Sequence, residues 1–233
     1  MVRLHVVVEG QTEETFVRDI LAPVVGEASV FADVHRVTTG RRRSKSYRGG
    51  FLRYAHLRRD LELWMSEDRG VDSWFTTMVD LYRLPQDVPG YSGSRSIADP
   101  VKRVRFLEDA LKADLGHRQF IPYIQLHEFE ALLFSGPASF AAAFPDEYGA
   151  VAELGRIRRS AASPEHIDDG IGTSPAERIR GLLPQYTKAV HGPIIAGRIG
   201  LARMRKECAH FNEWIDLILG LDEATKQSKR DHF

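Results

Sequence analysis

Cysteine is almost absent from the sequence, with Cys208 alone among 233 residues. An intrachain disulfide and a zinc site built from several cysteines are therefore excluded, and one thiol fits a reducing compartment. No apolar run is long enough to cross a bilayer, and no secretory signal pattern is found. We therefore expect a cytoplasmic protein without a membrane partner.

The chain also lacks net charge, because 32 basic residues balance 32 acidic ones. Any attraction to nucleic acid must then come from local clusters of charge. No G-x-x-x-x-G-K-[ST] loop and no H-E-x-x-H pair occur, which excludes nucleotide hydrolysis by a P-loop and a zinc site of that spacing. If an ATPase is needed, a partner protein must supply it.

What the sequence does contain is an alternation of short β-branched segments with amphipathic ones. The pattern predicts strands over 3–8, 31–37, 74–79 and 120–125, and helices over 11–25, 51–65, 100–115 and 127–134. Such an alternation favours an α/β fold with a parallel sheet covered on both faces. After residue 136 the pattern is helical, with breaks expected at Gly170, Gly172, Pro184, Gly192 and Pro193. We therefore expect an α/β domain over 1–136 and a helical C-terminal region over 137–233 packed on it.

Acidic residues follow two of the predicted strands. Glu9 comes directly after the first strand, and Asp80 directly after the strand over 74–79. In an open α/β sheet the carboxyl ends of the strands line one crevice, so both side chains should project into it. Glu13 lies one helical turn beyond Glu9 and can return to the same place. Glu9, Glu13 and Asp80 would suffice for Mg²⁺ or Mn²⁺, although Glu13 is equally explained as a first-turn acid that favours its helix.

Several motifs together resemble a known family. They are VVVEGQTEETFV, MVDLYRLP, FIPYIQLHEFEALLF, PEHIDDG, SPAERI, YTKAVHG and CAHFNEWI. The chain is similar through nearly its whole length to an uncharacterised bacterial family, known as a domain of unknown function, that is assigned a Toprim-like fold. The resemblance implies a Toprim/Rossmann-like parallel sheet flanked by helices, with an α-helical C-terminal extension. It also implies metal-dependent action on nucleic-acid phosphodiesters, since Toprim domains serve topoisomerases, primases and overcoming-lysogenisation-type nucleases.

Two positions depart from the Toprim pattern. The second motif is an Asp-x-Asp pair, and Tyr82 stands where the second aspartate is expected. A phenol does not replace a carboxylate on magnesium at neutral pH. Either the site holds a single ion, or another acid supplies the missing negative charge. Glu128 and Glu130 are the candidates, and two residues apart they should not both face the core from one helix. In SPAERI, Glu177 stands where a lysine is expected, which puts a phosphate contact there in doubt.

A basic segment, GRRRSKSYRGGF, is the second candidate site. Its cations are Arg41, Arg42, Arg43, Lys45 and Arg48. Blocks of like charge are often interaction segments, and these cations could engage the phosphates of DNA or RNA while Tyr47 stacks on a base. The alternative is a solvated loop without a partner.

Other conspicuous residues are expected to be structural. We interpret His127 as a hydrogen-bonded residue, Arg156, Arg158 and Arg159 as a solvated helix face, and Cys208 as inert packing. The aromatic residues of the closing helix, Phe211 and Trp214, are expected in the core.

The leading interpretation is thus a magnesium-dependent nuclease, or a nuclease subunit, of Toprim-like fold. Similar families also imply a subunit of a bacterial defence system that acts beside an ATPase, which is compatible with either an enzyme or a binding module. In the leading interpretation Glu9, Glu13 and Asp80 are catalytic metal ligands, and Glu128 and Glu130 complete or orient the shell. The alternative is a binding module for a nucleotide or nucleic acid that lost catalysis with the second aspartate. Tyr82 favours the module, whereas Glu9 and Glu13 favour the enzyme.

Overall fold

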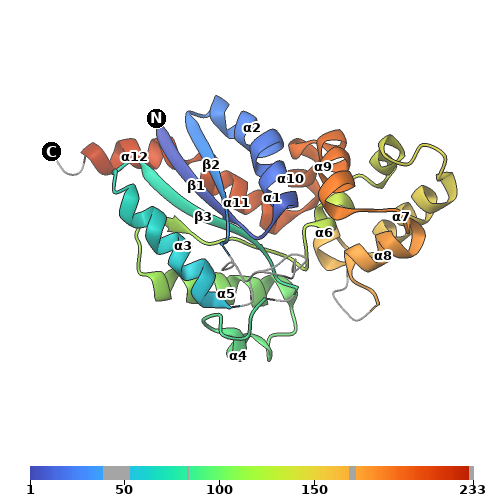
Figure 1. Ribbon diagram of the computed structural model, residues 1–233, viewed down its shortest axis with the longest axis horizontal. Coiled ribbons are helices and arrows are strands. Elements are labelled where there is room, and N and C mark those ends of the chain that lie inside the picture. The colour runs from blue at the N-terminus through green and yellow to red at the C-terminus, as the bar shows by residue number, and fades with distance from the viewer. Residues whose placement is uncertain (39–52, 83, 168–171, 231–233) are drawn as a thin grey trace, which may run out of the picture.

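The computed structural model describes residues 1–233 except 39–52, 83, 168–171 and 231–233, and except the side chains of 228–230. Its centre is a five-stranded parallel sheet in the order β2-β1-β3-β4, with β5 also paired to β3 (Figure 1). The strands are β1 (Val2–Val8), β2 (Val30–Arg36), β3 (Ser73–Asp80), β4 (Phe120–Ile121) and β5 (Ile124–Gln125). The predicted α/β class, with a parallel sheet flanked by helices and a helical C-terminal region, is confirmed.

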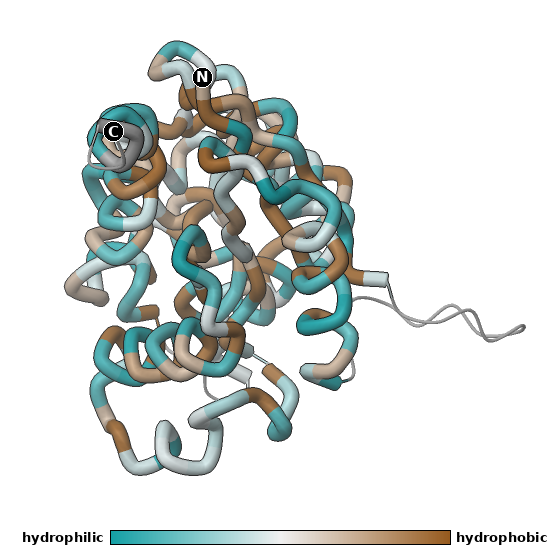
Figure 2. The backbone as a smooth tube through the Cα atoms, turned by 90° about the vertical axis from the view of Figure 1, so that its left-hand side faces the viewer, coloured by the Kyte–Doolittle hydropathy of each residue, from teal (hydrophilic) through white to brown (hydrophobic). Residues whose placement is uncertain are grey.

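Helices cover both faces of this sheet because the central strands are apolar on both sides. Leu4 and Val6 of β1 belong to one hydrophobic cluster, and Val7 belongs to the other. The second cluster includes residues of α3 (Tyr54–Glu67) and α5 (Pro100–Leu115), the helices that precede and follow β3. Hydrophobic and hydrophilic residues alternate in short stretches along the helical turns of the backbone, as in amphipathic helices (Figure 2).

The first cluster joins the N-terminal and C-terminal parts of the chain. After β1 comes one helical segment made of α1 (Gln11–Phe16), η1 (Val17–Leu21) and α2 (Ala22–Glu27). The C-terminal elements are α7 (Tyr148–Ser160), η3 (Pro164–His166), α8 (Pro175–Leu182), α9 (Lys188–Ile199), α10 (Leu201–Glu207), α11 (Ala209–Leu219) and α12 (Leu221–Arg230). Buried residues of the sheet, α1 and α7–α11 form a single cluster, so residues 1–136 and 137–233 share a core.

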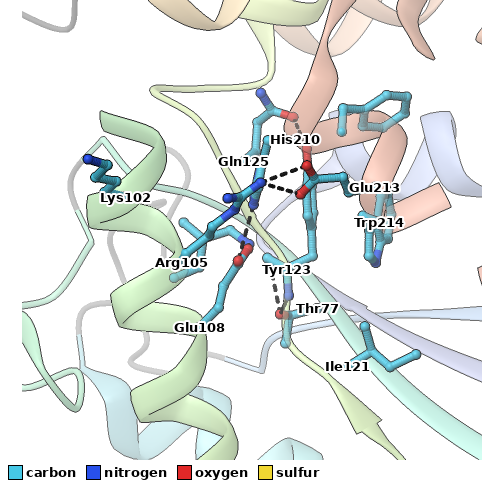
Figure 3. Close-up of polar contacts among 12 residues, drawn as sticks. Thr77, Lys102, Arg105, Glu108, Ile121, Tyr123, Gln125, His210, Glu213 and Trp214 are labelled. Carbon is cyan, nitrogen blue, oxygen red and sulfur yellow. Dashed lines mark hydrogen bonds and ion pairs between the residues drawn. The ribbon is translucent and has the colours of Figure 1, made fainter. Parts of the chain in front are cut away.

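Polar and aromatic contacts fix α11 beside the sheet. Arg105 on α5 donates two hydrogen bonds of 2.6 Å to the carboxylate of Glu213 on α11 (Figure 3). The ring of Tyr123 stacks on Trp214, with ring centroids 4.2 Å apart. Phe211 and Trp214 are buried, as the sequence predicts for the closing helix. Among the described residues, none of the helices combines the length and apolarity that a bilayer crossing requires.

Three sequence-based expectations about elements are wrong. The strand predicted over 120–125 is two short strands, because Pro122 has no N–H and the next N–H, of Tyr123, donates to Oγ1 of Thr77 instead (2.9 Å). The helix predicted over 127–134 is α6 (Glu130–Leu133), because His127 adopts a left-handed backbone conformation, with φ 59°. Gly192 and Pro193 do not end a helix but lie inside α9.

The remaining short elements are α4 (Tyr91–Ser94) and η2 (Pro137–Ala142). The predicted proline-initiated helix at Pro100 is confirmed, and its first turn is capped by Asp99, whose carboxylate accepts a hydrogen bond from the Lys102 N–H (2.8 Å). The expected break at Gly170 lies outside the described residues.

Candidate functional site

The carboxyl ends of β1 and β3 bring two acidic residues together. Glu9 directly follows β1, and Asp80 is the last residue of β3, the neighbouring strand. The backbone N–H of Asp80 donates to Oε2 of Glu9 over 3.2 Å. The strand-end placement inferred from the sequence therefore gives the expected proximity.

The side chain of Glu13, in the first turn of α1, points back towards Glu9 and Asp80. Its side chain is almost fully buried, and a Cβ atom added at Gly10 would lie 3.2 Å from Oε2 of Glu13. Gly10 therefore leaves the room that the returning carboxylate needs between the strand and the helix.

Lys188 lies at the centre of the acidic residues. It is the first residue of α9, and its Nζ is 2.9 Å from Oδ2 of Asp80, 3.1 Å from Oε1 of Glu13 and 3.3 Å from Oε2 of Glu130. The lysine side chain is 31% exposed, whereas the side chains of its three partners are at most 6% exposed. The ammonium group of this partly exposed lysine thus bridges three buried carboxylates. We call these three acids, together with Glu9, the acidic cluster.

Further hydrogen bonds orient two of these carboxylates. The N–H of Phe129 donates to Oδ1 of Asp80 (2.9 Å), and the hydroxyl of Tyr186 donates to Oε1 of Glu130 over 3.4 Å. The ammonium of Lys188 also lies 5.9 Å from the centroid of the Phe129 ring. Asp80 and Glu130 are therefore held by neutral donors as well as by the lysine.

Burial disfavours full ionisation of the acidic cluster. Burial raises the pKa of Glu9 to about 7, against the opposing effect of Lys188. Burial likewise raises the pKa values of Asp80 and Glu130, which lie beside other acids. Although burial opposes its charge, Lys188 has a raised pKa because Asp80, Glu130 and Glu13 surround it. Among the residues that the structure describes, four acids face one ammonium group, which leaves this part of the site with a deficit of positive charge.

The donor set suits Mg²⁺ or Mn²⁺, but its spacing suits an ammonium group. Both ions prefer carboxylate oxygens, and magnesium requires them at about 2.0–2.1 Å. The oxygens around Nζ lie at 2.9–3.3 Å, so they would have to close in by about 1 Å on an ion in that place. A divalent ion would also have to displace the ammonium group of Lys188.

Glu128 and Glu130 are the other two acids predicted from the sequence. Glu130 belongs to the acidic cluster, whereas Glu128 does not contact Lys188. Glu128 precedes α6, and its Oε1 accepts a hydrogen bond from the N–H of Ala176 in the first turn of α8 (2.6 Å). Both glutamates are buried, so the expectation that they could not both face the core is wrong. It assumed that both lie on one helix, whereas the helix begins at Glu130.

Tyr82 and His127 link the ends of two strands. The N–H of Tyr82 donates to the carbonyl of His127 over 2.6 Å, and Nε2 of His127 lies 2.9 Å from the carbonyl oxygen of Glu165. His127 is buried and hydrogen-bonded, in agreement with the structural role expected for it.

The basic segment, with Arg41, Arg42, Arg43, Lys45 and Arg48, lies outside the described residues. On α7, Arg156 and Arg159 are exposed as expected, whereas Arg158 is half-buried against Glu207 (2.7 Å).

Sequence reasoning missed Lys188. The residue occurs in the motif YTKAVHG, but it carries no local mark of an ion-pair centre, because its partners are 58–175 residues away along the chain. Tyr186, two residues earlier in the same motif, was missed for the same reason.

The fold and this site define an α/β protein with an acidic cluster at the carboxyl ends of a parallel sheet. The chain belongs to the family described as a domain of unknown function (DUF4276), whose model matches residues 8–219. The match includes all four acids of the cluster and Lys188. No curated protein and no solved structure matches the chain.

Proposed function

We propose that the protein is a metal-dependent hydrolase of nucleic-acid phosphodiesters with a Toprim-like fold, acting alone or as a nuclease subunit. The observation that supports this most is the deficit of positive charge in the acidic cluster. Within the part of the chain that the structure describes, Glu13, Asp80 and Glu130 contact one ammonium group, and Glu9 is influenced by the same charge. Isolated buried carboxylates are costly unless they are paired, protonated or bound to a cation. A binding site for a divalent cation explains why four acids converge here.

The four acids of the cluster would hold Mg²⁺ or Mn²⁺. When bound, the ion would polarise a phosphodiester and activate water for its attack. The side chain of Lys188 is 31% exposed, so part of its length reaches solvent, and its ammonium group could engage a phosphate oxygen once it leaves the carboxylates. In the metal-free protein the pKa of Glu9 is about 7, so binding of an ion near neutral pH would release a proton from this carboxyl group.

The proposed substrate is DNA or RNA, and the proposed location is the cytoplasm. The basic segment supports a nucleic-acid substrate, because its five cations can engage phosphates without reading the base sequence. The single cysteine, Cys208, supports a reducing compartment. The resemblance to Toprim-like nucleases supports an ATPase partner and a role in bacterial defence.

A non-catalytic binding module for a nucleotide or nucleic acid is the second candidate. The distances from the carboxylate oxygens to Nζ of Lys188 favour this candidate. They suit an ammonium group, and the lysine can neutralise the acids without a metal. Tyr82, in place of the second Toprim aspartate, also favours it. In this case the acidic cluster would be a structural ion-pair network.

Cleavage assays with matched variants separate the two candidates. The full chain is incubated with DNA and RNA in Mg²⁺ or Mn²⁺, with and without any ATPase that a neighbouring gene encodes. Glu9→Gln keeps the shape of the side chain and removes its charge. Since loss of even an outer-shell partner costs about 10–100-fold in metal affinity or activity, Glu9→Gln should reduce cleavage at least 100-fold while nucleic-acid binding persists.

Glu14→Gln is the control for this assay. Glu14 is adjacent to Glu13 on α1, but its carboxylate pairs with Arg36 (3.0 Å) outside the acidic cluster. Its replacement should leave cleavage unchanged. If the wild type cleaves nothing in either setting and still binds nucleic acid, the binding module is the better account.

A further inference from the structure

A second group of metal-ligating side chains lies on the sheet, on strands β1 and β2. His5 of β1 is paired in register with Asp33 of β2, and His35 follows two residues later on β2. Residues two apart on a strand face the same side of a sheet, so all three side chains share one face. Among the described residues, these three supply ligand atoms that all lie within 4.8 Å of one another.

The spacing of these atoms suits a tetrahedral ion. Nδ1 of His5 lies 3.3 Å from Nε2 of His35, which lies 3.3 Å from Oδ2 of Asp33. Ligands bonded to zinc at 2.0–2.1 Å in a tetrahedral arrangement are about 3.4 Å apart. Hydrogen bonds from a ring N–H are usually shorter, at about 2.9–3.0 Å. These two separations are therefore close to those of ligands around one centre and longer than those of typical hydrogen bonds.

A neighbouring carboxylate orients the first histidine for such a role. Nε2 of His5 lies 2.9 Å from Oδ2 of Asp68, and Asp68 is held in turn by Arg3 (2.8 Å) and Ser73 (2.5 Å). When Nε2 of His5 carries the proton and donates a hydrogen bond to Asp68, Nδ1 of His5 keeps its lone pair, which is directed at His35. Metal-bound histidines almost always donate their other ring N–H in this way.

Aromatic rings hold both imidazoles in place. Trp64 of α3 stacks on His35 with centroids 3.5 Å apart, and Phe75 of β3 stacks on His5 at 5.1 Å. The exposed fractions are 11% for the side chain of His5, 14% for His35 and 72% for Asp33. His5 and His35 are therefore held in position before an ion binds, and the exposed Asp33 leaves a path for the ion to enter from solvent.

We propose that His5, Asp33 and His35 form a binding site for one transition-metal ion, with zinc as the ion that suits it best. Two imidazoles and one carboxylate match zinc, whereas magnesium prefers the all-oxygen set of the acidic cluster. Three protein ligands leave a fourth position for water. The ion would tie the edge strand β2 to β1 and stabilise the folded chain. Because His5 and Glu9 are four residues apart on an extended strand, about 13 Å, the site is separate from the acidic cluster and independent of the proposed function.

Zinc titration of the untagged, metal-free full chain against a chromophoric chelator tests this site. We expect one high-affinity ion per chain and a melting temperature that rises with zinc. Asp33→Asn and His35→Gln should each weaken zinc binding at least tenfold and remove the zinc-dependent rise. Asp33 is exposed, so its variant tests the proposal even if His35→Gln impairs folding. Cobalt bound in place of zinc should give the visible absorption of a tetrahedral site in the wild type and lose it in Asp33→Asn.

Two control variants separate this site from other metal ligands. His166→Gln removes an exposed histidine elsewhere, and Glu9→Gln removes an acid of the acidic cluster. Both should leave zinc affinity unchanged. The proposal is overturned if the wild type shows no saturable zinc binding, if Asp33→Asn and His35→Gln bind zinc as the wild type does, or if Glu9→Gln abolishes the binding.

Discussion

The ammonium group of Lys188 lies 2.9 Å from Oδ2 of Asp80, although 108 residues separate the two along the chain. The acid ends a strand of the sheet, and the lysine begins helix α9 in the C-terminal region. The candidate site is therefore built from both regions, and its charge balance depends on how α9 packs against the sheet.

Replacement of Lys188 should destabilise the protein in a pH-dependent way. Lys188→Gln removes the one cation of the acidic cluster, and breaking a buried pair on one side typically costs about 3–5 kcal/mol. Because the lysine is partly exposed, we expect a loss on the order of 3 kcal/mol at pH 8 and a smaller loss at pH 5, where protonation of the acids removes the unpaired charge. Urea unfolding at both pH values measures this.

Lys206→Gln is the matched control, because Lys206 is exposed on the surface of α10. It should change the free energy of unfolding by less than about 0.5 kcal/mol. A Lys188→Gln variant as stable as the wild type at pH 8 would contradict the role assigned to the ammonium group.

The stability of the metal-free protein should fall as the pH rises through neutrality. Burial raises the pKa of Glu9 from 4.5 to about 7, so the folded state binds the extra proton between these values. This contribution is fully present below about pH 4.5 and is lost as the pH passes about 7, and Asp80 and Glu130 shift in the same direction. The change for Glu9 is on the order of 1–3 kcal/mol, since its side chain is not wholly buried.

Glu9→Gln should flatten this dependence and raise the melting temperature at pH 8 relative to the wild type. Thermal melts in a chelator between pH 5 and pH 8 provide the measurement. An equal slope in the variant and the wild type would show that Glu9 does not hold the proton.

Gly192 should resist substitution because α9 and α1 approach closely there. A Cβ atom at Gly192 would lie 3.2 Å from Cγ2 of Thr12 and 3.4 Å from both Phe129 and the Tyr186 hydroxyl. Gly192→Ala should lose about 1 kcal/mol, because this crowding outweighs the gain in helix propensity. Gly197 on the same helix meets only Ile20, at 3.9 Å, so Gly197→Ala should gain roughly 0.5–1 kcal/mol. Equal effects of the two substitutions in urea unfolding would refute the close approach as the cause.

The basic segment should determine nucleic-acid affinity and its dependence on salt. Replacing Arg41, Arg42 and Arg43 with Ala should weaken binding and reduce the log-log salt slope by about one unit per lost phosphate contact. Filter binding over a range of salt concentrations measures both quantities. The sequence predicts a loop for this segment, and exposed loop charges contribute little to stability, so the melting temperature should hardly change. An Arg156→Ala/Arg159→Ala control should leave both unchanged, and an unaltered slope in the triple variant would indicate a solvated loop.

The order of strands and helices was predictable because it rests on local patterns. The alternation of β-branched and amphipathic segments predicted the first three strands and the helix that begins at Pro100. The ends of the predicted strands located Glu9 and Asp80. The segment 120–134 was not predicted correctly, because its conformation depends on contacts that periodicity does not report. Pro122 interrupts the pairing, and the left-handed conformation of His127 delays the start of α6 until Glu130.

The centre of the candidate site was not predictable for a different reason. Lys188 has no sequence neighbour that marks it, and its three carboxylates come from α1, β3 and α6. The group of His5, Asp33 and His35 was missed as well, because its members become neighbours only when β1 and β2 pair in register. Long-range pairing created both groups, and no spacing rule applied to the linear chain finds them.

Anomalous diffraction from a crystal soaked in manganese tests the central claim, that the acidic cluster is a divalent-metal site. The account predicts a manganese peak bonded to carboxylates among Glu9, Glu13, Asp80 and Glu130, with the Nζ of Lys188 displaced from Oδ2 of Asp80. A saturated soak in which Lys188 keeps its contacts with Asp80, Glu13 and Glu130 and no manganese lies among them would contradict it.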